Sequence, residues 1–316
     1  MEKARASLKW QTVSLVVVTS VVIISGLILA SLLLFQQSYL NLEQQAVRQQ
    51  TRLVVSLIQK EQEKLERFVQ DWGPWDDTYF FARNENPDYV EKNLAEATFA
   101  NQKFNIFLVV DEEKRVVFYR QYHLERKTWV RSPFISFLQE ILKHPYLAER
   151  SEVVAPLRGV LRTGDGFWLI SGHPILHSDF SGPRAGTLVV ARQVNDALRQ
   201  EVMAQSSFQV EFEALPLGTH SMGFDVILPV EVHPIDAEWA RGSVVFQDVY
   251  LRPAFRVSVR VERLIFKQGR EVISFFCGYP DALWRGVWIG GLAGSTDAGN
   301  PSAGEAGGAF AVHPRD

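Results

Sequence analysis

The spacing of hydrophobic and polar residues divides the chain into an apolar N-terminal run, an amphipathic helix and a region of alternating helices and strands. Residues 13–35 carry no charged side chain. As a helix rising about 1.5 Å per residue, they would cross a hydrocarbon core of about 30 Å. No shorter apolar region with a small-residue cleavage site is evident, so the run predicts an uncleaved transmembrane helix. Basic residues at positions 3, 5 and 9 precede it, and the positive-inside rule therefore places residues 1–12 in the cytoplasm and the following segment outside.

Residues 36–72 continue as a predicted stalk helix with an apolar stripe. The apolar positions follow two seven-residue registers: Leu40, Val47, Val54 and Phe68 in one, and Ile58, Leu65 and Trp72 in the other. The partner of this stripe is either the chain's own folded domain or a second copy in a parallel homodimer. Because Gln50 and Glu61 interrupt the registers, the pattern leaves both interpretations open.

The predicted stalk ends at the sequence "DWGPWDDTY", residues 71–79. Pro74 cannot lie inside a helix without loss of a backbone hydrogen bond, but it suits the first position of a new helix with Gly73 as the cap before it. We therefore expect the long helix to stop near Trp72 and a short helix to begin at Pro74. The stretch is a corner of the fold.

The side chains of this corner allow two interpretations. In the first, Asp76 and Asp77 oppose the positive dipole end of the short helix, and Trp75 and Tyr79 share one face and anchor it. In the second, the rings and carboxylates hold an amine cation. That box would consist of Trp72, Trp75, Tyr79, Asp71, Asp76 and Asp77.

Residues 73–270 alternate between helical and strand patterns, which predicts an extracytoplasmic domain of mixed α+β class. A hairpin is expected over residues 104–121, further strands over 166–171, 186–192 and 255–262, and helices over 86–102, 132–147 and 196–204. In the clearest strand, 255–262, apolar and polar residues alternate, as in a half-buried antiparallel strand. The pattern leaves open whether residues 207–262 complete the first sheet or form a second lobe.

Composition and charge narrow the function classes. The chain has 316 residues, a net charge of -3 and an isoelectric point near 6.2, so it carries no general basic field for nucleic acid. Its single cysteine, Cys277, excludes an intramolecular disulfide framework and a cysteine-rich zinc site. These features favour an ordinary globular domain on a membrane anchor.

Several motifs stand out along the chain: the membrane anchor, the corner motif, "NL" at residues 93–94, "FLVVDEEKRVVF" and "GHPILHSDFSGPRAGTLVVAR". Together they resemble the CHASE sensory domains of type four, the extracytoplasmic modules of bacterial histidine kinases and cyclic-di-GMP enzymes. The resemblance implies a PAS/Cache-like sensor lobe that detects a small stimulus and relays it through the membrane, with no catalytic role for its signature residues. By matching positions the signature comprises Asp71, Trp72, Trp75, Asp76, Asp77, Tyr79 and Asn93.

The C-terminal part departs from that family pattern. Residues 271–294 are a poor second membrane segment because Pro280, Asp281 and Arg285 lie near the middle, each charge costing about 2.5–3.5 kcal/mol on insertion. Residues 295–316 are rich in Gly, Ala and Ser and are expected to be a disordered tail. We therefore expect a receptor truncated before any output domain.

No catalytic or cofactor motif is evident, since the sequence lacks a phosphate-binding loop, a nucleophile elbow and a paired-histidine zinc helix. The remaining metal-site candidates are His173, His177 and Asp179, whose even spacing would place them on one face of an extended strand. Pro174 and the loop-like composition argue against that site. No metal and no cofactor is therefore expected.

The sequence thus predicts a non-enzymatic sensor in the bacterial inner membrane, with a cytoplasmic N-terminus, an extracytoplasmic domain and an unidentified small-molecule ligand. The alternative is a membrane-anchored interaction or structural protein without such a ligand. A partly polar cavity within residues 100–195 would favour the sensor.

Overall fold

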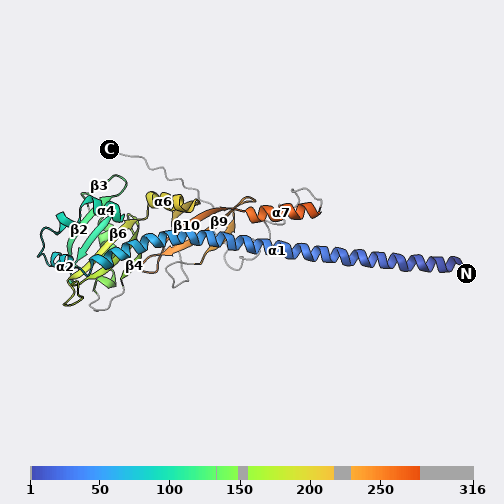
Figure 1. The fold of residues 1–316 in the computed structure, drawn as a ribbon, viewed down its shortest axis with the longest axis horizontal. Coiled ribbons are helices and arrows are strands. Elements are labelled where there is room, and N and C mark those ends of the chain that lie inside the picture. Colours follow the sequence, from blue (N-terminus) through green and yellow to red (C-terminus); the bar gives the residue numbers. More distant parts are fainter. Residues whose placement is uncertain (1, 133, 149–155, 217–228, 278–316) are drawn as a thin grey trace.

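The computed structural model describes residues 2–132, 134–148, 156–216 and 229–277. One long helix, α1 (Glu2–Trp72), runs the length of the molecule, and two antiparallel sheets lie along the half of it that is distant from the N-terminus (Figure 1). The mixed α+β class predicted from the sequence is confirmed. The other helices are α2 (Asp76–Ala82), α3 (Tyr89–Asn93), α4 (Glu96–Gln102), α5 (Ile135–Ile141), α6 (Asp196–Ser206) and α7 (Leu264–Cys277), with a 3₁₀ turn at Pro145–Ala148.

Helix α1 is continuous because residues 27–72 contain neither Gly nor Pro. Its N-terminal part from Val13 is long and apolar enough to cross a membrane: the most apolar stretch has a mean hydropathy of 2.7, and none of that stretch is buried by the described chain. The helix ends where predicted: the N–H of Gly73 still donates to the Val69 carbonyl at 2.8 Å, and Pro74 then has no N–H to continue the ladder. The apolar segment and the corner are thus the two ends of one rod.

The first sheet has six strands in the order β3-β2-β1-β6-β5-β4. Its central strand β1 is buried on both faces, which explains its uninterrupted apolar sequence. Phe107 and Val109 pack toward α1, whereas Leu108 and Val110 pack toward α5. The strands are β1 (Ile106–Val110), β2 (Val116–His123), β3 (Thr128–Trp129), β4 (Leu157–Thr163), β5 (Gly166–Ile175) and β6 (Gly186–Gln193).

The second sheet has four strands in the order β7-β10-β9-β8, so residues 207–262 do not complete the first sheet. The alternation expected over residues 255–262 is confirmed in β10, where Phe255, Val257 and Val259 are fully buried. An isolated parallel bridge between Val160 of the first sheet and Asp248, just after β9, helps to join the two sheets. The strands are β7 (Gln209–Ala214), β8 (Glu231–Pro234), β9 (Trp239–Gln247) and β10 (Pro253–Glu262).

The apolar stripe of α1 packs on these two sheets, so the first of its two interpretations describes the structure. Val47, Val54, Ile58, Leu65 and Phe68 are all buried against the chain's own domain. The approach to β9 is close enough that a Cβ at Gly242 would collide with the Thr51 side chain. This stripe is therefore covered and cannot also form the seam of a homodimer while the described fold is intact.

Some predicted boundaries were wrong. The short helix starts at Asp76 rather than Pro74, because Trp75 is extended, with φ -133° and ψ 128°. The helix predicted over residues 86–102 is two helices, α3 and α4, separated at Leu94 and Ala95. The helix α7 begins beside α1, and residues 278–316, which contain most of the doubtful second span and the predicted tail, lie outside the described residues.

Candidate functional site

The aromatic residues of the corner form one cluster where α1 meets the first sheet. The Trp72 ring stacks on Phe68 with centroids 4.6 Å apart and contacts Trp75 edge-on at 5.4 Å. Trp75 also packs on Tyr89 of α3 at 6.0 Å. Tyr89 is fully buried, and its hydroxyl shares a 2.8 Å hydrogen bond with Thr78, while burial raises its pKa. These distances are those of favourable aromatic pairs, so the cluster anchors the corner.

Tyr79 belongs to a different neighbourhood from the two tryptophans. Because Trp75 precedes α2, the two side chains do not share one helix face. The Tyr79 ring lies on His177, with centroids 3.7 Å apart, and its hydroxyl accepts a hydrogen bond from Arg83 at 3.2 Å. The structure therefore distributes the rings of the proposed aromatic box between two sets of partners.

The acidic signature residues separate in the same way. Asp76 Oδ1 lies 2.7 Å from His177 Nδ1, and the backbone N–H of Ser178 donates to the same oxygen at 3.2 Å. The His177 hydrogen bond, reinforced by that N–H, holds the pKa of Asp76 below its ordinary value. Asp71 and Asp77 are exposed. Asp76 therefore fastens the corner to the loop after β5, an interaction that sequence reasoning missed because the partners are 101 positions apart.

Gly73 makes the second attachment of the corner to β5. Its carbonyl accepts the Leu176 N–H at 3.2 Å. A Cβ at this position would lie 2.6 Å from His173 Nδ1 and 2.9 Å from the Pro174 carbonyl, so only glycine fits. The signature residue Asn93 ends α3, where its carbonyl accepts the Thr98 hydroxyl at 2.8 Å.

The three candidate metal ligands have separate roles. His173 Nδ1 lies 2.8 Å from the Pro174 carbonyl, and burial lowers the pKa of this imidazole. Asp179 accepts the Ser181 N–H at 2.9 Å, and His177 pairs with Asp76. Strand β5 ends at Ile175, so the extended geometry expected of residues 173–179 does not hold. Within the part of the chain that the structure describes, no three His, Cys, Asp or Glu residues are grouped to hold a metal.

A groove on the first sheet offers a more open site, and it lies within residues 100–195. Two adjoining pockets of about 630 and 450 Å³ share Gln121, Trp129, Val130 and Arg131. The Arg120 guanidinium lies 3.8 Å from the centre of the Trp129 ring and donates to the Leu94 carbonyl at 3.1 Å. The only sequence signal for this groove is the run of polar and aromatic residues at 118–123.

The groove is positively charged. Arg126 and Arg131 are exposed beside it, and neither forms an ion pair with a carboxylate of the described residues. At its floor the Tyr119 hydroxyl donates to Gln121 Oε1 at 2.7 Å, and burial raises the pKa of Tyr119 to about 12. Tyr119 is therefore a neutral hydrogen-bonding group at physiological pH, and the charge facing the groove comes from arginine.

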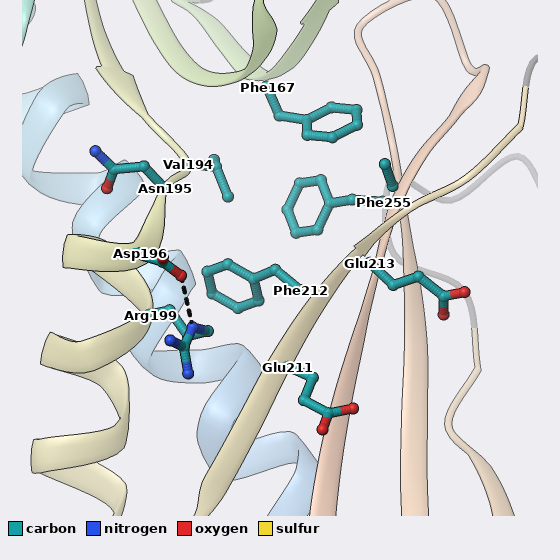
Figure 2. A pocket seen from close by; sticks show the side chains of 10 residues that line it. Phe167, Val194, Asn195, Asp196, Arg199, Glu211, Phe212, Glu213 and Phe255 are labelled. Atoms are coloured by element: carbon teal, nitrogen blue, oxygen red, sulfur yellow. Dashed lines mark hydrogen bonds and ion pairs between the residues drawn. The ribbon is translucent and has the colours of Figure 1, made fainter. Parts of the chain in front are cut away.

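A second cavity, of about 370 Å³, lies between the two sheets (Figure 2). Phenylalanine side chains of both sheets point into it, and helix α6 closes one side. Its walls are formed by Phe167, Val194, Phe212, Ala214 and Phe255, with Asp196 and Arg199 at the mouth.

Buried ion pairs join α1 to the first sheet and to the residue that follows the second sheet. Glu61 on α1 pairs with Arg192 on β6, and Arg192 also reaches Glu201 of α6 at 2.9 Å. Nearer the membrane segment, Glu43 pairs with Arg263, just before α7. A Cβ at Gly269 of α7 would meet the Tyr39 ring at 2.9 Å, so α7 runs back along α1 toward its apolar end.

Comparison with known proteins gives one family match. Residues 57–213 match the family model of the CHASE4 domain. The chain is 25% identical over 233 residues to the methanogenesis regulatory histidine kinase FilI of Methanothrix harundinacea, a match covering 74% of this chain and 26% of that kinase. The chain thus spans about a quarter of the length of this relative.

Two solved structures show a weaker likeness. The periplasmic domain of Vibrio cholerae LuxQ is 12% identical, with a TM-score of 0.42, and the match covers 68% of this chain and 99% of that domain. The sensor domain of the V. cholerae histidine kinase DctB is 13% identical, with a TM-score of 0.41, and the match covers 70% and 98%.

Proposed function

Since residues 57–213 belong to the CHASE4 domain family, we propose that the chain is the membrane-anchored, extracytoplasmic sensor of a signal-transduction receptor whose stimulus is a small anionic molecule. The apolar run would cross the plasma membrane with its N-terminus in the cytoplasm, because the basic residues precede this run. In this role the described domain binds and relays, and does not catalyse.

The observation that carries the proposal is the unbroken helix α1. It joins the apolar segment to the corner of the first sheet over 71 residues, and both sheets pack on it. The Glu61–Arg192 and Glu43–Arg263 pairs fix its position at two levels. A change in the sheets would therefore displace a helix that continues toward the membrane, as a rigid-body relay requires.

The position of α7 supports the same role. Helix α7 leads the chain from β10 back toward the apolar end of α1, beside Tyr39. A displacement of α1 relative to α7 would therefore be transmitted to the membrane surface. By analogy with the relative that is a histidine kinase, we propose that the signal passes to a kinase-type output.

The ligand site that we favour is the groove beside Trp129. Its exposed arginines, Arg126 and Arg131, suit a carboxylate or phosphate group of a ligand. The Trp129 ring and the Gln121 side-chain amide suit the uncharged part of the same ligand. A homodimer, which such a receptor could use, would need the face of α1 opposite the buried stripe, where Leu42 and Leu53 are each about half exposed.

The test is a thermal-shift screen of the full chain in lipid nanodiscs against small carboxylates and phosphate esters. A ligand that binds the folded state must raise its melting temperature. We expect a hit to lose its effect in Arg131→Gln and to keep it in Lys127→Gln, a nearby exposed cation outside the groove. A hit that is equally effective on both variants would place the ligand site outside the groove, and no hit at all would favour an interaction protein without a small ligand.

A further inference from the structure

The cavity between the sheets has walls of aromatic rings and is independent of the groove proposed above. Phe255 forms the floor: it is fully buried and stacks on Phe246 with centroids 5.0 Å apart and planes 5° apart. Phe167 of the first sheet lies 5.3 Å from it, and Phe212 of the second sheet lies 5.8 Å from it, both tilted. These rings leave faces and edges available to a further ring.

The charged groups around the mouth are either paired with one another or directed away from the rings. Arg199 Nε donates to Asp196 at 3.0 Å, and Nη1 contacts the Met203 sulfur at 3.3 Å. Glu211 and Glu213 are both directed away from the phenylalanine rings (Figure 2), and Glu213 pairs with Arg256 at 2.9 Å. A charged ligand would lose its hydration here without gaining an unpaired counter-charge.

We propose that this cavity binds a small uncharged aromatic molecule of one or two rings, such as an indole or a phenol. A volume of about 370 Å³ lies within the range of about 300–1,000 Å³ that is usual for ligand pockets. Because Phe167 and Phe212 belong to different sheets, the bound ring bridges them. Binding therefore stabilises one relative arrangement of the sheets and adds a second input to the sensor.

The test uses indole as the probe and the full chain in lipid nanodiscs. Ala214 is exposed, lies opposite Phe255 in the strand register and faces the cavity, so Ala214→Trp fills the cavity without removing a core side chain. Gln209→Trp is the matched control, since it adds the same side chain to an exposed position of the same strand outside the cavity. Partition of indole into lipid is equal in all samples, so differences report the protein.

We expect indole to raise the melting temperature of the wild type and of Gln209→Trp, and its affinity to fall at least about tenfold in Ala214→Trp. Val194→Trp, on the opposite wall, replaces Ala214→Trp if that variant does not fold. Equal shifts in all variants, or none, would overturn the proposal. An effect of benzoate or benzylamine that is stronger than that of indole and is lost in Ala214→Trp would overturn the assignment of an uncharged ligand.

Discussion

The ion pair between Glu61 and Arg192 is expected to couple the stalk helix α1 to the first sheet. The losses in free energy of unfolding caused by substituting each residue should therefore be strongly non-additive. The two side chains are only 6% and 3% exposed, so neither charge is solvated by water when its partner is removed. Loss of one member of a buried pair costs about 3–5 kcal/mol, whereas replacement of both by apolar residues of similar volume is close to neutral. Glu201 still compensates Arg192 in part, which places Glu61→Leu near the lower end of that range.

The assay is urea unfolding of the full chain in detergent micelles, followed by the fluorescence of its eight tryptophans. We expect Glu61→Leu to lower the free energy of unfolding by about 3 kcal/mol and Arg192→Met by a similar amount. The double variant should lose about 1 kcal/mol or less, because it leaves no buried unpaired charge. Glu66→Leu, which removes the more exposed pair with Arg158, is the control and should cost about 0–1 kcal/mol. Additive losses in the double variant would refute the reasoning.

Three further outcomes are expected at the corner. Gly73→Ala should lower the free energy of unfolding in urea by about 1–3 kcal/mol, because the new Cβ meets two backbone carbonyls. Gly26→Ala, the control with open space around it, should not lower that free energy. Equal effects of the two substitutions would contradict the close packing at Gly73. Trp75→Ala should cost about 2–3 kcal/mol, less than a fully buried tryptophan, because Trp75 is only partly buried; an unchanged midpoint would argue against its anchoring role. Asp76→Asn should lower the melting temperature at pH 7, and the difference should shrink as the pH falls through the lowered pKa of Asp76, since the stabilisation requires the carboxylate; a difference independent of pH would exclude this cause.

The features that the sequence predicted are those determined by neighbours along the chain. The apolar run, the end of α1 at Gly73 and Pro74, and the alternation in β10 each depend on local backbone chemistry or on periodicity. The start of α2 was misplaced by two residues because the extended backbone of Trp75 is set by the ring cluster around it.

The features that could not be predicted depend on residues distant in sequence. In the sequence Glu61 interrupts the apolar stripe of α1, yet its side chain is buried because Arg192 lies opposite it on β6. Likewise, His177 read as a metal-ligand candidate until its contact with Asp76 across the corner was known. The choice between one sheet and two also depended on strand pairing, which alternation alone does not specify.

The central claim, a sensor domain held outside the cell membrane by α1, can be tested by cysteine accessibility in intact cells. In a Cys277→Ser background, Glu112→Cys places a thiol on the exposed β1–β2 turn, and Ser7→Cys places one before the apolar run. A membrane-impermeant maleimide should label position 112 in intact cells or spheroplasts, and position 7 only after the membrane is permeabilised. Labelling of position 112 only after permeabilisation would contradict the account.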